Sequence, residues 1–295
     1  MPSLSRRRLI ALAGAAGATS LLPRFAWAGA NSWPAGIQLY TVGKALKADT
    51  PGALKQLHEI GYREVESAGT APYKADEFRK MLDDAGLVCP SAHLQLGGPE
   101  TEAQYAVAHT LGAHYAVSSV LFTPGQRPKL SGLGLEGFKG LAARMNEVGK
   151  SAHAAGLQYT YHNHNFEFEK MPDGSPGYDV LVKETDPELV KFEIDCGWMT
   201  VAGANPVNYF QKYPGRFRML HIKDFKPTGH PVISLEKPER PDGTDLGTGF
   251  VEYKPIFAAG KAAGIEHIFV EQEEPFPVSQ MESAKQDFAY LKKLS

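Results

Sequence analysis

The chain has 295 residues, of which 43% are hydrophobic and 22% are charged, and this composition excludes a disordered, collagen-like or disulfide-scaffold protein. The formal charge is −2, and lysine and arginine are not concentrated anywhere beyond the first 30 residues. A nucleic-acid groove, which needs many basic contacts to phosphates, is therefore not expected.

The first 28 residues have the layout of an export signal. An arginine triplet at residues 6–8 precedes a short apolar run at residues 9–22, and a small-residue end follows at residues 26–28. The run is too short and too rich in glycine for a stable membrane span, so we expect no membrane anchor. The arginines favour the twin-arginine route over a general secretory signal or a soluble helix. We therefore predict a cleaved signal peptide at residues 1–28, a periplasmic protein, and one domain at residues 29–295.

Segments with strand character and segments with helix character alternate through the rest of the chain. Predicted strands occupy residues 36–40, 62–66, 87–93, 114–119, 157–162, 190–195, 217–222 and 267–271. Predicted helices occupy residues 51–60, 76–85, 102–111, 141–155, 178–184, 207–213, 253–263 and 281–294. Several of these helices end in a glycine that directly precedes a strand: Gly61, Gly86, Gly156 and Gly264.

This alternation indicates right-handed strand–helix–strand units and a parallel sheet. Eight such units fit a single-domain (β/α)8 TIM barrel of the α/β class. An open doubly wound sheet is the alternative, but residues 40–44 lack the glycine-rich phosphate turn that follows the first strand in many such sheets. The longest loop is expected at residues 227–249, after the seventh strand, where it would lie at the barrel mouth.

The chain has two cysteines, Cys89 and Cys196. Two cysteines in an exported protein can form a disulfide. Both of these, however, fall in predicted buried strands that are far apart in the strand order. We therefore expect two free, buried thiols.

Polar residues collect at the carboxyl ends of the predicted strands, where TIM barrels carry their chemistry. Core packing does not need such residues, because burying a charge costs free energy unless the charge is paired or bound to a metal. Converging carboxylates and imidazoles therefore predict a divalent-metal site. The residues at these ends are Gln38, Tyr40, Glu66, His93, His162, His164, Glu193, Asp195, His221, Lys223 and Glu271.

Several of these residues also have simpler explanations when each is considered alone. His93 is then a hydrogen-bonded rim residue, and Glu66 forms an ion pair at the rim. Lys223 is then the ion-pair partner of Asp224 or Glu193. These alternatives stay open at the level of the sequence.

Three residues are stronger candidates for metal ligands when they are considered together. Asp195, His221 and Glu271 lie on three successive strands, which places them side by side and favours them as metal ligands. The acidic run at residues 271–274 is interpreted as partly a solvated loop. Within it, strand alternation points only Glu271 inward.

Five motifs carry a family resemblance: HNHNFEF at 162–168, KFEIDCGW at 191–198, MLHIKDF at 219–225, GTGFVEY at 247–253 and FVEQEEP at 269–275. Together they resemble the xylose isomerase-like barrel superfamily, which includes sugar phosphate isomerases and epimerases and the inosose dehydratases. The resemblance implies one Mn²⁺-like ion, with Co²⁺, Mg²⁺ or Zn²⁺ as alternatives, held at the ends of strands five to eight.

The resemblance also implies the ligands. By position, Asp195, His221 and Glu271 match the metal ligands of the family. Many members have a glutamate where this chain has His162, and its His–x–His sequence resembles the inosose dehydratase branch instead. His162 is therefore the implied fourth ligand, with His164 as its substitute or as a substrate contact.

The implied chemistry is proton abstraction next to a carbonyl through an enediolate. Glu271 is the expected base, and Lys223 is expected to hold a substrate oxygen or shuttle a proton. Glu66 and His93 are expected to orient substrate hydroxyls. Trp198 replaces a histidine found in many members, and its flat apolar ring suits the face of a sugar.

These expectations combine into a metal-dependent isomerase- or epimerase-type enzyme with a small carbohydrate substrate, a sugar or keto-sugar. A lyase that dehydrates or cleaves a keto-polyol or 3-keto-glycoside is the alternative, because it shares the enolate step. A site with a single metal-linked glutamate argues against a two-base epimerase. A non-catalytic sugar-binding barrel and an abasic-site endonuclease fit the ligand set and the negative charge less well. Export favours an unphosphorylated substrate, and a homo-oligomer is compatible with the sequence.

Overall fold

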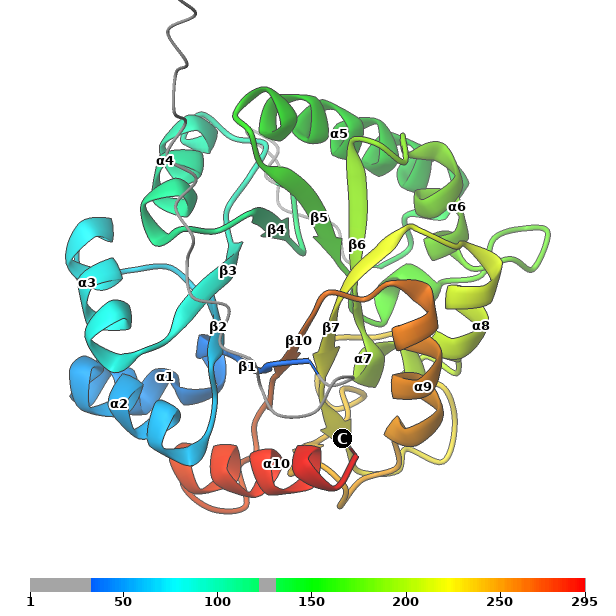
Figure 1. Ribbon diagram of the computed structural model, residues 1–295. Coiled ribbons are helices and arrows are strands. Elements are labelled where there is room, and N and C mark those ends of the chain that lie inside the picture. The colour runs from blue at the N-terminus through cyan, green and yellow to red at the C-terminus, as the bar shows by residue number, and fades with distance from the viewer. Residues whose placement is uncertain (1–32, 122–130, 295) are drawn as a thin grey trace, which may run out of the picture. The chain divides into compact units, whose positions relative to one another are not determined.

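The alternating strands and helices close into a barrel of eight parallel strands (Figure 1). The computed structural model describes residues 33–121 and 131–294, so the predicted signal peptide lies outside the described residues. Around the barrel the strand order is β1-β10-β7-β6-β5-β4-β3-β2. The barrel strands are β1 Ala35–Gln38, β2 Glu64–Ser67, β3 Val88–His93, β4 Tyr115–Ser118, β5 Gln158–His162, β6 Val190–Asp195, β7 Phe217–Ile222 and β10 His267–Val270. The predicted single-domain (β/α)8 fold is confirmed.

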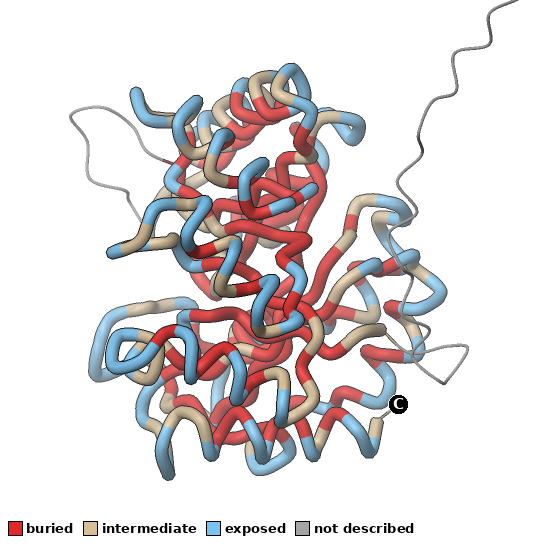
Figure 2. The backbone as a smooth tube through the Cα atoms, turned by 60° about the vertical axis from the view of Figure 1, so that its left-hand side comes forward, coloured by how far each residue is buried: buried red, intermediate tan, exposed pale blue. Residues whose placement is uncertain are grey.

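Helices surround the barrel, and buried residues lie along the strands and the inner faces of the helices (Figures 1 and 2). None of the described helices is long and apolar enough to cross a bilayer. The longer helices are α2 Thr50–Ile60, α3 Ala75–Ala85, α4 Thr101–Leu111, α5 Gly134–Ala154, α6 Gly177–Glu184, α8 Pro206–Lys212, α9 Tyr253–Ala263 and α10 Gln280–Leu294. Shorter helical segments are η1 Leu39–Val42, α1 Gly43–Ala48, η2 Phe166–Phe168 and α7 Cys196–Val201.

The first strand is shorter than predicted. The side chain of Gln38 accepts a hydrogen bond from the backbone N–H of Tyr40, and this cap starts the 3₁₀ helix η1. The prediction that the strand reaches Tyr40 is therefore wrong. Tyr40 instead lies at the barrel mouth with 64% of its surface exposed.

The loop after β7 also contains structure that the sequence did not predict. Two short strands, β8 Asp224–Phe225 and β9 Gly243–Thr244, pair antiparallel within it. The carboxylate of Asp224 accepts backbone N–H bonds from Gly247, Gly249 and Val251. A Cβ atom on Gly249 would lie 2.2 Å from Asp224 Oδ1, so this approach requires glycine. The GTGFVEY motif is therefore the part of the loop that the carboxylate binds.

Both cysteines are free and buried, as predicted. Burial raises the pKa of the Cys89 thiol to about 12 and holds that of Cys196 well above its ordinary value. Since the thiolate is the reactive form, both cysteines are chemically inert at neutral pH.

Asp287 on α10 provides a prediction about stability. Its Oδ1 accepts the N–H of Leu246 at 2.7 Å, while burial raises the carboxyl pKa to about 8. A carboxyl whose pKa is higher in the folded than in the unfolded protein stabilises the fold at pH values below its unfolded pKa of about 4. This stabilisation of the fold is lost as the pH rises to 8. Asp287→Asn should therefore stabilise the protein at pH 8 by about 2–4 kcal/mol and leave it unchanged at pH 4. Denaturant melts at both pH values measure this, and equal gains at pH 4 and pH 8 would refute it.

Candidate metal centre

Four side chains from four neighbouring strands meet at the carboxyl end of the barrel. His162 ends β5, Asp195 ends β6, His221 lies near the end of β7, and Glu271 directly follows β10. Strand pairing sets Asp195 opposite His221, and β10 lies beside β7 on the other side. One nitrogen or oxygen from each of the four residues lies within 4.8 Å of the others. The structure thus brings together all four residues expected as ligands.

The donor atoms of this cluster fit a divalent cation. Two imidazoles and two carboxylates are a set that Mn²⁺, Zn²⁺, Fe²⁺ and Co²⁺ accept. His162, Asp195 and His221 are buried, whereas the side chain of Glu271 keeps 11% of its surface exposed. Asp195 Oδ2 pairs with the Lys223 ammonium at 3.0 Å.

Asp195 also begins the helix that follows it. Its Oδ1 accepts the backbone N–H of Trp198 at 2.8 Å and caps α7. The cap orients the carboxylate and leaves Oδ2 directed toward His162 Nε2, 3.8 Å away. The Asp-Cys-Gly-Trp sequence thus folds as a strand end followed at once by a helix.

Glu193 is a site residue that the sequence analysis did not assign. Its Oε2 lies 3.0 Å from His162 Nδ1 and 3.2 Å from His221 Nε2, so it contacts both imidazoles. Burial, together with the charge of Glu66, holds the pKa of Glu193 well above its usual range. Groups of this kind fix the orientation of metal-ligating histidines. Strand alternation carries the signal, because Glu193 lies two residues before Asp195 on the same face of β6.

Glu66 lies beneath the pocket rather than on its surface, although we expected it to orient substrate hydroxyls. Its carboxylate contacts His221 Nε2 at 2.9 Å and accepts hydrogen bonds from Gln38 and Ser91. Burial opposes its ionisation, but His221 and His93 lower the pKa of Glu66 to about 2. An ionised Glu66 therefore orients His221 through an ionic hydrogen bond.

Lys223 is buried, and its ammonium contacts three carboxylates. The Nζ atom lies 3.0 Å from Asp195, 2.7 Å from Glu271 and 2.8 Å from Glu273. The alternative pairing with Asp224 or Glu193 is therefore wrong. Burial opposes the charged form, yet Asp195 and Glu271 raise the pKa of Lys223 above its ordinary value. In turn, Lys223 and His221 outweigh burial and hold the pKa of Glu271 well below 4.5. Glu271 is thus ionised and Lys223 charged at neutral pH.

Glu271 was expected to be the only residue of the acidic run 271–274 that points inward. This expectation is wrong, because Glu273 points inward as well. Its carboxylate is buried and accepts hydrogen bonds from Trp198 Nε1 at 3.0 Å and from Lys223. It also contacts the guanidinium of Arg240, which comes from the long loop after β7. Arg240 carries no distinguishing signal in the sequence, because it is one of several charged residues in that loop.

Trp198 has no exposed surface. Lys223 and Arg240 lie over its ring, with the charged atoms 5.3 and 5.8 Å from the ring centroid. The structure therefore places the ring under these two cations rather than as an open wall against a sugar.

A pocket of about 500 Å³ opens beside the cluster. This volume lies within the roughly 300–1,000 Å³ typical of small-molecule sites. His162 and Glu271 reach its wall, together with Gln38, His93 and His164. Burial, with the charge of Lys223, lowers the pKa of His164 to about 3, so this imidazole is neutral. The pocket therefore combines two of the candidate ligands with neutral hydrogen-bonding groups and the charged pair of Arg240 and Glu273.

Comparisons with known proteins agree with this fold. The model of the xylose isomerase-like TIM barrel family matches residues 54–294. An inosose dehydratase from Clostridium beijerinckii is 25% identical over 265 residues, which cover 81% of this chain and 88% of that protein. A sugar phosphate isomerase/epimerase structure from Parabacteroides distasonis superposes with a TM-score of 0.72 at 25% identity, covering 89% of this chain and 98% of that one. A xylose isomerase-like barrel from Mycobacterium smegmatis, solved in complex with magnesium, shares the fold with a TM-score of 0.61 at 17% identity, covering 89% and 96%.

Proposed function

Since this chain belongs to the xylose isomerase-like TIM barrel family, we propose that it is a divalent-metal-dependent enzyme that enolises a sugar or keto-sugar. The observation that carries this proposal is the cluster of His162, Asp195, His221 and Glu271, two members of which, His162 and Glu271, reach the wall of a substrate-sized pocket. Manganese is the proposed metal, and Co²⁺, Mg²⁺ or Zn²⁺ would suit the same ligands. A bound cation would act as a Lewis acid on substrate oxygens and stabilise the negative charge of an enediolate.

Glu271 is the proposed base. It is ionised, and its side chain, with 11% of its surface exposed, is the most accessible of the four at the pocket. A general base must lie within hydrogen-bond reach of the proton that it removes, and the position of Glu271 at the pocket wall meets this need.

Lys223 complements the base with a positive charge. Its ammonium is held 2.7 Å from Glu271 and remains protonated, so it acts as a donor toward developing negative charge rather than as a second base. His93 and His164 reach the pocket wall and are placed to hold substrate hydroxyls. A single carboxylate base and a single ammonium match isomerisation, which we propose as the reaction.

Dehydration is the second candidate, and two observations favour it. His162 occupies the strand-five position, so Glu271 is the only glutamate of the four-residue cluster. The relative from Clostridium beijerinckii is an inosose dehydratase. Removal of a proton by Glu271 followed by loss of a β-hydroxyl, protonated by Lys223, would complete such an elimination.

Enolisation is tested by deuterium exchange. We expect NMR spectra in D₂O to show deuterium entering the carbon beside the carbonyl when the protein is incubated with a panel of keto-sugars and 3-keto-glycosides. EDTA should abolish the exchange because the ligands lose their cation, and added Mn²⁺ should restore it. A product that has lost one water by mass spectrometry would identify a lyase, and an isomeric product an isomerase. Exchange that survives complete metal removal would refute the proposal.

We also propose that residues 1–28 direct the protein to the periplasm, where unphosphorylated carbohydrates are the available substrates. The paired arginines support this proposal. Since the twin-arginine route carries folded proteins, the metal would be acquired before export. Fractionation of cells that express the chain with Arg6 and Arg7 replaced by lysine provides the test. Periplasmic accumulation of that variant would contradict export by the twin-arginine route.

A further inference from the structure

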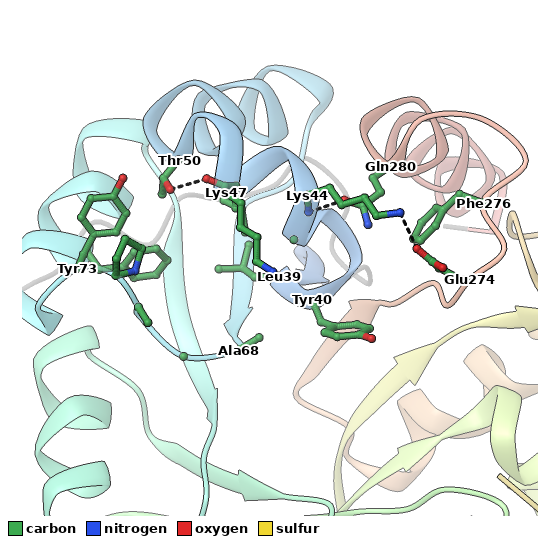
Figure 3. Close-up of a pocket in the computed structure, with 16 residues that line it drawn as sticks. Leu39, Tyr40, Lys44, Lys47, Thr50, Ala68, Tyr73, Glu274, Phe276 and Gln280 are labelled. Carbon is green, nitrogen blue, oxygen red and sulfur yellow. Dashed lines mark hydrogen bonds and ion pairs between the residues drawn. The ribbon is translucent and has the colours of Figure 1, made fainter. Parts of the chain in front are cut away.

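The pocket of about 500 Å³ beside the ligand cluster is called the metal pocket below. A second pocket, of about 370 Å³, adjoins it at the barrel mouth, and we call this second one the extension pocket. It lies between the segments that follow β1, β2 and β10. Tyr40 and Ala68 line both pockets, so the two spaces are immediate neighbours. Figure 3 shows Tyr73 and Phe276 on opposite sides of the extension pocket, with Lys47 from α1 between them.

The walls of the extension pocket are mostly apolar, and two of its neutral polar groups, the Thr50 hydroxyl and the Gln280 amide oxygen, are already engaged. The Thr50 hydroxyl donates to the backbone carbonyl of Leu46, and the Gln280 amide oxygen accepts the N–H of Lys44. A second sugar ring would need free hydrogen-bonding partners around its hydroxyls. The pocket is therefore suited to an apolar group instead, and its aromatic residues offer faces to a flat ring.

The charges of the extension pocket do not balance. The ammonium of Lys44 pairs with Glu274 at 2.6 Å. Lys47 forms no ion pair with any carboxylate among residues 33–121 and 131–294. One positive charge thus remains at the edge of an apolar pocket, and this arrangement favours a ligand that is both apolar and anionic.

We propose that the extension pocket binds the aglycone of the substrate, and that this aglycone is an aromatic group with a carboxylate or another anionic substituent that pairs with Lys47. The inference rests on the proposed function, because it makes the substrate a keto-sugar glycoside rather than a free monosaccharide. The sugar would lie in the metal pocket, and the link to the aglycone would pass Tyr40 and Ala68.

Calorimetry with four unoxidised ligands tests the inference without turnover. The ligands are 4-carboxyphenyl β-glucoside, phenyl β-glucoside, cellobiose and glucose. We expect the phenyl glucoside to bind about tenfold more tightly than glucose, because the ring leaves water. The carboxylate should add about threefold to tenfold through Lys47. Equal affinities for all four ligands, or tighter binding of cellobiose than of the phenyl glucoside, would overturn the inference.

Two variants separate the contributions. Lys47→Gln should remove only the advantage of the carboxylate, and Tyr73→Ala should weaken both aryl glucosides while leaving glucose unchanged. Lys55→Gln, an exposed lysine on α2, is the matched control and should change none of the affinities. A Lys47→Gln variant that retains the preference for the carboxylate would refute the role of Lys47. Absence of deuterium exchange with every keto-sugar would refute the proposed enolisation but not the inference about the extension pocket. The order of the four affinities is measured without turnover.

Discussion

Asp195→Asn should lose both its metal and its activity. The asparagine oxygen can still accept the Trp198 N–H that caps α7, so the helix and the barrel are retained. The negative charge at Oδ2, however, is removed from the centre of the ligand cluster. We expect metal analysis to give about one ion per chain in the parent protein and less than a tenth of that in the variant. Turnover of the best keto-sugar should fall about a thousandfold or more.

Asp173→Asn is the matched control, because Asp173 is exposed in the loop before α6 and belongs neither to the ligand cluster nor to the lining of the pocket beside it. It should retain both its metal and its turnover. Circular dichroism of Asp195→Asn should match that of the parent. A folded Asp195→Asn protein with a full complement of metal would remove Asp195 from the site, and with it the assignment of the cluster.

Glu271→Gln should separate proton abstraction from binding. The glutamine retains an oxygen of similar size, but its amide is too weak a base to take a proton from carbon. We expect deuterium exchange and turnover to fall by about 10²–10⁴-fold. With Mn²⁺ supplied in excess to offset the lost ligand charge, substrate affinity should change much less, because the other pocket residues are unaltered.

The control for Glu271→Gln is Glu274→Gln, three residues along the same segment. Glu274 is exposed and pairs with Lys44, outside the ligand cluster. Its replacement should leave the exchange rate of a free keto-sugar unchanged. If Glu271→Gln exchanges deuterium at the parent rate while it holds its metal, another group is the base.

The fold was predictable because its signals are local and repeated. Strand and helix segments alternate along the chain, and several helices end in glycine at a positive φ, as at Gly86 and Gly264. The ligand cluster was predictable for a related reason. In a parallel barrel all strands end on one face, so polar residues at those ends must converge.

What the sequence did not reveal depends on contacts between distant segments. Glu273 is buried because Trp198 and Lys223 donate to it, and Arg240 reaches it from a loop. No periodicity in that loop marks Arg240 as a site residue. Trp198 was expected to face a sugar, and only the packing of the Arg240 loop over its ring shows that it is covered.

The order of assembly follows from the way the barrel closes. β1 pairs with β2 on one side and with β10 on the other, and the proposed base directly follows β10. During translation the last strand leaves the ribosome tunnel after the other seven, so a nascent chain holds three of the four ligand residues but no complete ring. A ribosome-stalled or prematurely terminated product that ends before residue 267 would therefore have no enzymatic activity. Activity would require the closing strand.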